Sequence, residues 1–277
     1  MTRHLGSAAL AALLLFVLAR PASAQSTGAR QFGVWLDDAT VSPPGQGWGT
    51  FGVGYVRANF GEQWDAPSAD VGIGIPPKIQ ISLSVPFTRI DFTDGTTIRS
   101  MGDAYGAVKM TLLDPAEPDR SFGVAIVPVV EFLSSSSVEE GAGRTHWALA
   151  VPVEKRFETF RVYGSAGYYS RGSAFAAAAA EVPVSTNVTL TGTLSFAHSL
   201  EDDPVSDAQG LSGSRWDVSG GAVYFLNPKA TLYASLGRTI SHIDTNAATF
   251  AFAAGVSFGF QHRIGGPDRP ASGKPRP

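Results

Sequence analysis

The sequence contains no cysteine, and beyond its N-terminal region it has no further long apolar run. An exported domain without disulfides must be held together by its core, by a closed sheet or by a membrane. The missing apolar runs exclude transmembrane helices, which need about 18 or more apolar residues. Charged residues are also scarce, at 16% of the chain, against roughly 25% in soluble domains. Such a chain is typical of a transmembrane β-barrel.

The first 24 residues have the three parts of a secretory signal peptide. A short basic start at residues 2–4 precedes an apolar stretch at residues 8–18 and an A-x-A cleavage site at residues 22–24. The alternative, a transmembrane anchor, needs a longer apolar segment. We therefore expect residues 1–24 to be a signal peptide, with the mature chain beginning near Gln25.

Acidic residues outnumber basic ones. Without the signal peptide, 19 Lys and Arg residues face 24 Asp and Glu residues, for a net charge near −5. This balance argues against nucleic acid as a partner.

The clearest structural signal is the stretch Asp70–Phe87, in which apolar and polar or small residues alternate on both sides of Pro76-Pro77. Side chains on a strand alternate between two faces, so each arm is predicted to be a strand with one apolar face. A soluble sandwich would give the same local pattern, and the distinction therefore depends on how the pattern repeats.

The alternation recurs in about twelve segments. These are residues 48–58, 70–75, 79–87, 101–112, 122–132, 146–154, 160–170, 175–184, 188–196, 216–225, 230–238 and 249–260. The segment 175–184 is the least distinct, because Ala176–Ala180 also fits a helix on propensity alone. A barrel needs an even return, which favours a strand there.

Short and long connections alternate along the chain. Short turns are predicted at residues 76–77, 114–119, 156–158, 184–187 and 227–228, and most other connections, including 59–68 and 88–100, are longer and polar. Outer-membrane barrels combine short periplasmic turns with longer external loops, whereas a sandwich has no reason to do so. We predict an all-β fold, a transmembrane antiparallel up-and-down β-barrel of about 12 strands. It spans residues 48–260, after an irregular segment at 25–47 and before a disordered tail at 261–277.

One face of each strand must point into the barrel lumen. The polar side chains predicted there are Asp70, Gln80, Asp103, Tyr105, Lys109, Glu131, His146, Glu154, Arg161 and Asp217. Two interpretations stay open, because small barrels fill their interiors with side chains. The charges either pair across the lumen and fill it, or they line a narrow passage. The sequence also leaves open whether residues 25–47 plug the lumen. Six aromatic residues are predicted at the membrane interfaces, namely Trp48, Tyr55, Trp147, Tyr168, Trp216 and Tyr224.

Pro128 and Pro152 lie inside predicted strands. Proline cannot donate to a β-ladder and normally marks an edge or a bulge. We consider two interpretations, ordinary bulges and a weakened lateral seam in the barrel wall through which an apolar solute leaves.

No catalytic or metal-binding constellation stands out, and we expect neither enzymatic activity nor a cofactor. His198-Ser199 raises the alternative of a barrel lipid hydrolase. Neighbours on a strand face opposite ways, however, and a nucleophile and its base must be within hydrogen-bond reach.

Three stretches, SPPGQGWGTFGVGY, GDAYGAVKM and VPVVEFLSSSS, resemble the outer-membrane β-barrel transporters of the meta-pathway phenol-degradation family. The likeness extends over residues 42–260. It implies a Gram-negative outer-membrane barrel that admits small aromatic or other apolar compounds, with Asp103 and Lys109 in the lumen. Barrels of that family commonly end on an aromatic residue, whereas in this chain Phe260 is followed by a tail.

The sequence thus favours a porin-like outer-membrane channel or transporter for small solutes. Its expected partners are membrane lipid, the solute and the barrel assembly machinery. A closed barrel with a structural or adhesive role is the alternative from another class.

Overall fold

The computed structural model describes residues 35–117, 119–133, 145–170, 172–200, 213–241 and 247–261. The predicted signal peptide, residues 25–34 and the tail beyond Gln261 lie outside the described residues. No helix among the described residues has the length and apolar character needed to cross a membrane.

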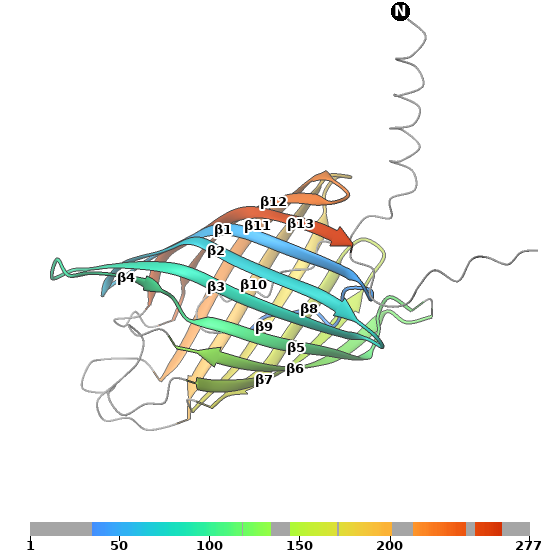
Figure 1. Ribbon diagram of the computed structural model, residues 1–277, viewed down its shortest axis with the longest axis horizontal. Helices are drawn as coiled ribbons and strands as arrows, with labels where there is room; N and C mark the ends of the chain where they lie inside the picture. The colour runs from blue at the N-terminus through green and yellow to red at the C-terminus, as the bar shows by residue number, and fades with distance from the viewer. Residues whose placement is uncertain are drawn as a thin grey trace, which may run out of the picture.

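The described chain consists of antiparallel strands (Figure 1). They are β1 (Gln46–Ala58), β2 (Gly61–Ile75), β3 (Ile79–Phe92), β4 (Thr97–Met101), β5 (Ala104–Leu113), β6 (Phe122–Phe132), β7 (Thr145–Arg156), β8 (Arg161–Tyr169), β9 (Ser173–Pro183), β10 (Val188–Ser199), β11 (Ser214–Asn227), β12 (Ala230–Thr239) and β13 (Ala248–Gln261).

The sheet closes into a barrel. Strands pair with their neighbours in the chain, β1 pairs with β13, and β2 pairs with β3 to complete the ring. The short β4 pairs with the outer part of β3 and leads into β5 after residues 102–103. Leaving β4 aside, twelve strands form the wall, and the prediction of a 12-stranded antiparallel barrel is confirmed.

The period-two pattern explains the two faces of the wall. In β6, alternate side chains from Gly123 to Glu131 are buried, whereas Phe122, Val130 and Phe132 are exposed. Because opposite residues in a ladder share a face, the register carries this division around the ring. Polar and small residues therefore predominate on the inward face, with some valine and aromatic residues among them, and large apolar residues predominate on the outward face.

The segment β9 is a strand, so the helical alternative for Ala176–Ala180 is wrong. Every residue of β9 from Ser173 to Glu181 pairs with both β8 and β10. Two ladders outweigh the small intrinsic preference of alanine for helix.

Two connections predicted as polar loops are corrected. The β1–β2 connection is a turn at residues 59–60, and the β3–β4 connection covers only residues 93–96. Beyond the apolar band both faces of these strands meet polar surroundings, so the hydrophobic alternation stops. The backbone ladder needs no such alternation, and both hairpins extend beyond the band.

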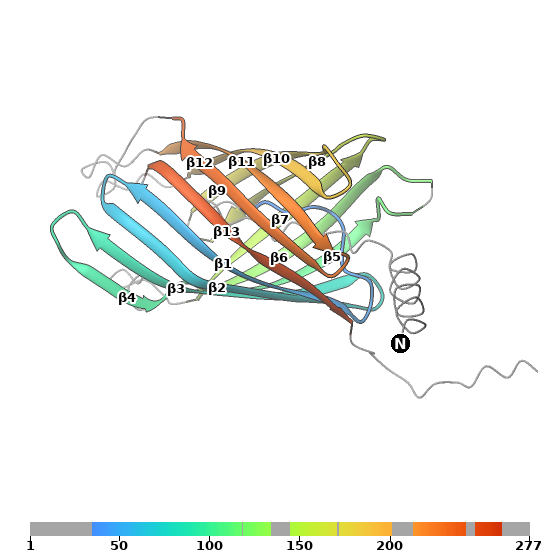
Figure 2. The same cartoon turned by 90° about the horizontal axis from the view of Figure 1, so that it is seen from above.

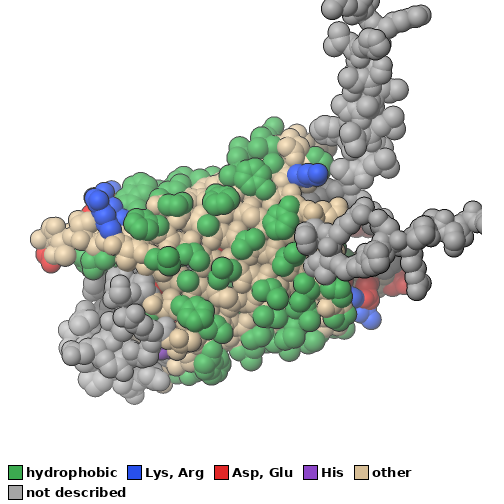
Figure 3. Space-filling view, in the orientation of Figure 1, with side chains coloured by type: hydrophobic (Ala, Val, Ile, Leu, Met, Phe, Trp, Pro, Cys, Tyr) green, Lys and Arg blue, Asp and Glu red, His purple; other side chains and the backbone are tan. Residues whose placement is uncertain are grey.

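Apolar side chains cover the outer surface, and charged ones gather toward its two ends (Figure 3). Of the predicted interface aromatics, Trp147, Trp216 and Tyr224 are exposed on this surface. The prediction for Trp48 is wrong, because this residue shares the inward face with Thr50 and lies against Gly72.

The connections between strands lie at the two ends of the barrel (Figure 2). We call proximal the end that carries the connections at residues 76–78, 157–160, 184–187 and 228–229, and distal the opposite one. The barrel begins with β1 and ends with β13 at the proximal end, as expected for an even number of strands.

Candidate functional site

The described residues directly before β1 lie inside the barrel. Residues 35–45, here called the inner segment, join β1 through a turn in which the Gln46 amide donates to the Pro43 carbonyl at 2.9 Å. Pro44 and Gly45 occupy the central positions, and Gly45 has a φ of 79°. Proline followed by a glycine with positive φ is the signature of a type II turn. This turn directs the chain from the lumen into the wall.

Glycine on the adjacent strand makes room for this turn. Pro44 bridges to Gly74 of β2, and the Gly45 amide donates to the Gly74 carbonyl at 2.9 Å. A Cβ added to Gly74 would overlap the Ser42 carbonyl oxygen. The Ser42 amide also donates to Gln80 Oε1 of β3 at 3.0 Å.

Two acidic residues of the inner segment bind the buried amine of Lys109 on β5. The Lys109 Nζ atom lies 2.8 Å from Asp37 Oδ1 and 3.1 Å from Asp38 Oδ1, and it donates to the Asp38 carbonyl at 3.2 Å. The Lys109 side chain is 3% exposed and that of Asp38 is 1% exposed. A buried charge is tolerated only when paired, so these contacts hold the segment to the wall.

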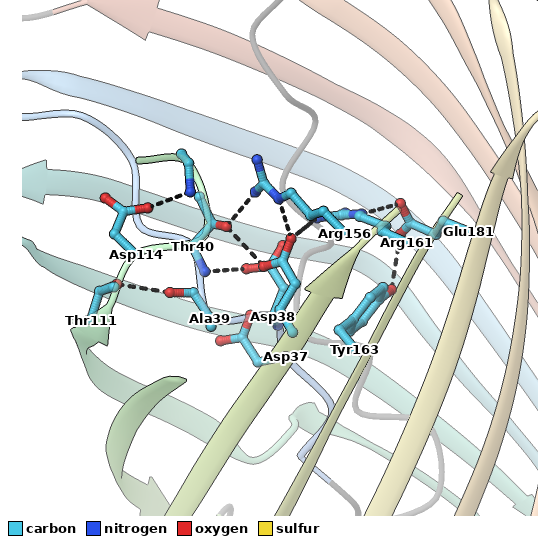
Figure 4. A network of polar contacts seen from close by, with 12 residues as sticks. Asp37, Asp38, Ala39, Thr40, Thr111, Asp114, Arg156, Arg161, Tyr163 and Glu181 are labelled. Atoms are coloured by element: carbon cyan, nitrogen blue, oxygen red, sulfur yellow. Dashed lines mark hydrogen bonds and ion pairs between the residues drawn. The ribbon is translucent and has the colours of Figure 1, made fainter. Parts of the chain in front are cut away.

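A second set of contacts joins Asp38 to β8 and β9 (Figure 4). Arg161 places Nη1 3.0 Å from Asp38 Oδ2 and Nε 2.7 Å from Glu181 Oε2. The Tyr163 hydroxyl donates to the other oxygen of Glu181 at 2.9 Å. Arg161 therefore sits between a carboxylate of the segment and one of the wall.

Thr40 ties the segment to the proximal end of β7. Its hydroxyl donates to Glu154 Oε2 at 2.9 Å and accepts from Arg156 Nη2 at 2.7 Å. Arg156 also pairs with Glu154 at 2.6 Å, and Thr111 donates to the Ala39 carbonyl at 2.8 Å.

Trp35 and Leu36 form the apolar part of the inner segment. Each is 6% exposed, and both belong to a buried apolar cluster with inward-facing residues of β5 to β9. The wall residues of this cluster are Ala107, Val127, Val129, Ala148, Ala150, Tyr163, Tyr169, Phe175, Ala177 and Ala179. The Ser165 hydroxyl donates to the Trp35 carbonyl.

The two carboxylates of the segment have different proton affinities. Burial raises the pKa of Asp37 to about 6; Lys109 opposes this shift and the charge of Asp38 adds to it. Burial also acts to raise the pKa of Asp38, but Lys109 and Arg161 outweigh it and the pKa falls below its ordinary value. Asp38 has two cationic partners in these contacts and Asp37 has one, so Asp37 takes up a proton first.

The inward faces of β10 to β13 have a different character. Their half-buried side chains are hydroxyl-bearing or small with few exceptions, and include Thr189, Thr191, Thr193, Ser195, Ser219, Gly221, Tyr233, Ser235, Gly237, Ala253, Gly255 and Ser257. We call this face the hydroxyl wall and the inward faces of β5 to β9 the packed wall. Partial exposure of inward side chains means that space reached by solvent adjoins the hydroxyl wall.

The polar residues singled out in the sequence fall into three groups in the structure. Lys109, Arg161 and Glu154 meet at the inner segment, together with the nearby Gln80. Asp70, Tyr105, Glu131, His146 and Asp217 point inward elsewhere; Asp217 accepts from Thr239 and pairs with Arg215, and His146 lies opposite Glu131. Asp103 lies in the break between β4 and β5.

Pro128 and Pro152 face opposite sides of the wall. Pro128 is exposed and opposite Leu149, whereas Pro152 is fully buried and opposite Ser165. The β6–β7 ladder runs to Val127↔Ala150 and resumes at Val124↔Val153. The β5–β6 ladder is interrupted beside Pro128 in the same way. The prolines thus interrupt two different ladders, and their role as a seam stays a prediction.

Sequence reasoning missed the partners supplied by the inner segment, Asp37, Asp38 and Thr40. It also missed Arg156 and Glu181 of the wall. The available signal was the sequence WLDDAT at residues 35–40, an apolar pair followed by an acidic pair just before the first strand. That pattern has no strand period, so nothing in it indicates which wall it contacts.

His198 forms its contact with Ser214 across the β10–β11 ladder. Its Nδ1 atom lies 2.7 Å from Ser214 Oγ on the exposed surface. Ser199, the neighbour suggested by the sequence, lies on the opposite face. Among the described residues, no group of three His, Asp or Glu side chains could hold a metal ion.

Comparison with known proteins identifies the fold. No family model and no curated protein matches the sequence. An outer membrane channel from Pseudomonas putida F1 is 14% identical, with a TM-score of 0.59 over 80% of this chain and 98% of the channel. The NanC porin is 12% identical, with a TM-score of 0.56 over 76% and 98%. The KdgM porin is 9% identical, with a TM-score of 0.52 over 76% and 99%. These similarities show that the chain has the fold of an outer-membrane porin-like β-barrel.

Proposed function

We propose that this protein is a passive channel for small solutes in the outer membrane of a Gram-negative bacterium, exported by its N-terminal signal peptide. Three features support this proposal: the apolar outer surface, the closed wall, and the porins and channel among the structural neighbours.

One observation carries the channel role. Inward residues of the packed wall are mostly buried, together with the inner segment, whereas those of the hydroxyl wall are mostly half-buried. A filled structural barrel would bury both sides alike. We propose that the solute passes along the hydroxyl wall and that the inner segment, the described part of predicted segment 25–47, acts as a plug that narrows the proximal mouth.

The solute class rests on the sequence resemblance to meta-pathway phenol-degradation transporters, which favours small aromatic or other apolar compounds. The weak charge and abundant hydroxyl groups of the proposed path suit neutral or singly charged molecules of this kind. Asp70, Asp103 and Asp217 are the carboxylates proposed to tune ion selectivity.

Single-channel conductance of the folded mature chain in a planar bilayer tests this function. We expect discrete current steps, and a changed cation-to-anion ratio in Asp103→Asn. Silence from protein shown by circular dichroism to be folded would contradict the channel and favour the closed structural barrel.

The His198–Ser214 contact keeps a second candidate, a barrel hydrolase acting on lipid. A serine hydroxyl beside an imidazole on a lipid-facing surface is the minimum arrangement of nucleophile and base. Hydrolysis of phospholipid vesicles that disappears in both Ser214→Ala and His198→Ala would support it. No hydrolysis by the wild-type chain would remove it.

A further inference from the structure

The residues that hold the inner segment form a cationic cluster when the segment is considered apart. The wall contributes Lys109, Arg156 and Arg161 together with the carboxylates of Glu154 and Glu181. This cluster has an excess of one positive charge. The segment adds the two carboxylates of Asp37 and Asp38.

Lys109 depends most on the segment. Both of its ion pairs among the described residues are with Asp37 and Asp38. Arg161 keeps wall partners in Glu154 and Glu181. Displacing the segment would leave the Lys109 ammonium without these two counterions on the inward face that the segment had covered, and such a charge favours binding an anion.

An apolar surface adjoins the cations. Trp35 and Leu36, directly before Asp37, occupy an apolar surface formed by Val127, Val129 and other wall residues. The segment thus places an aromatic ring on the apolar surface and carboxylates on Lys109 and Arg161 within four consecutive residues.

We propose that Lys109, Arg161 and the adjoining apolar surface form a binding site for a small aromatic carboxylate, in which Trp35 to Asp38 is an internal competitor. The inference rests on the proposed channel function and narrows its solute class. A solute with a ring and a carboxylate would replace both halves of the segment's contacts. Its binding would displace the segment and open the proximal mouth.

Competition gives the site a measurable signature. When the segment covers the site, the ligand cannot bind, so the apparent affinity equals the intrinsic affinity multiplied by the fraction of molecules with a free site. Weakening the segment's contacts therefore raises the apparent affinity. In Asp37→Asn/Asp38→Asn the segment loses its charges while the wall is unchanged. The matched control is Glu62→Gln/Asp94→Asn, which removes two carboxylates near the distal end.

The test is equilibrium dialysis of radiolabelled benzoate against the folded mature chain in detergent, at constant salt. We expect the Asp37→Asn/Asp38→Asn variant to bind benzoate about tenfold more tightly than wild type, and the control variant to match wild type. Adding Lys109→Gln to Asp37→Asn/Asp38→Asn should abolish the gain. Benzyl alcohol, which has the ring without the charge, and acetate, which has the charge without the ring, should show a much smaller gain.

Equal benzoate affinity in wild type and Asp37→Asn/Asp38→Asn would overturn the proposal, as would an equal gain for benzyl alcohol. Asp38→Asn alone, which removes the carboxylate shared by Lys109 and Arg161, provides a milder variant with an intermediate expected gain. Resistance of the folded barrel to unfolding in cold detergent gels checks each preparation. The same preparations are measured in planar bilayers. Current steps without a benzoate effect would refute this site and leave the channel standing, whereas silent barrels would refute the channel.

Discussion

The packed wall and the hydroxyl wall have the same strand geometry but differ in what covers their inward faces. The packed wall points alanine, valine, aromatic and charged side chains inward, and the inner segment packs on them and pairs with the charges. The hydroxyl wall points mainly threonine, serine, glycine and alanine inward and leaves most of them half-buried. A barrel of this size can therefore be filled on one side and remain accessible on the other, according to which side the inner segment covers.

The difference also separates two kinds of polar residue. Buried charges such as Lys109 and Glu154 must be paired, so they fix the position of whatever pairs with them. Hydroxyl groups such as Thr193 and Ser219 satisfy one another within the wall, and water can replace either partner. The charged side is suited to hold a segment, and the hydroxyl side is suited to let a solute pass.

Breaking the packed wall should give the largest effect. Lys109→Met leaves Asp37 and Asp38 without their shared amine, and removing one partner of a buried pair costs about 3–5 kcal/mol. We expect the segment to leave its site and the single-channel conductance to rise severalfold. Arg215→Met, the same kind of change beside Asp217 of β11, is the control, and equal conductance in Lys109→Met and wild type would contradict a narrowing role for the segment.

Filling the hydroxyl wall should give the next largest effect. Thr191→Trp adds a large ring on the inward face of β10, and we expect conductance to fall to a fraction of the wild-type value. Leu190→Trp places the same ring on the outward face, where Leu190 is already exposed, and should conduct normally. If both variants conduct as wild type does, the solute path does not follow this wall.

A smaller effect should appear with pH. The pKa of Asp37 is raised in the docked segment, so its contribution to docking is complete below about pH 4 and is lost as pH rises through about 6. We therefore expect the single-channel conductance to increase when the pH of the recording solution is raised from 4.5 to 7. This increase should be absent in Asp37→Asn. A decrease over that range in wild type would reverse the assignment of the proton to Asp37.

The two prolines should give the smallest effect. If they weaken the wall laterally, Pro128→Ala/Pro152→Ala restores backbone donors and should slow uptake of an apolar solute into proteoliposomes, while conductance of ions stays the same. Unchanged uptake would remove the seam and leave two ordinary ladder interruptions.

Much of the barrel was predictable because the alternation of residues within each strand shows which of its side chains face inward. The inward positions of Lys109, Glu131, Glu154 and Asp217 follow from parity alone, since side chains alternate regardless of what the rest of the chain does. The hairpin extensions at residues 59–68 and 88–100 were missed because the alternation signal exists only where one face meets lipid.

The candidate site was less accessible to sequence reasoning. Asp37 and Lys109 are 72 residues apart, and the inner segment has neither strand nor helix periodicity to indicate its neighbours. Parity placed Lys109 on the inward face but could not say whether its partner would be another wall residue, a segment of the chain or a solute.

The sequence by itself determined the closed antiparallel sheet, its apolar exterior and the residues that face inward, because a two-residue period and the need to pair every backbone group in a membrane leave few alternatives. Only the tertiary structure decided that the inner segment lies on β5 to β9 and leaves β10 to β13 accessible. The position of the segment depends on the combined volumes and charges of side chains brought together from distant parts of the chain. No local pattern in the sequence predicts this combination.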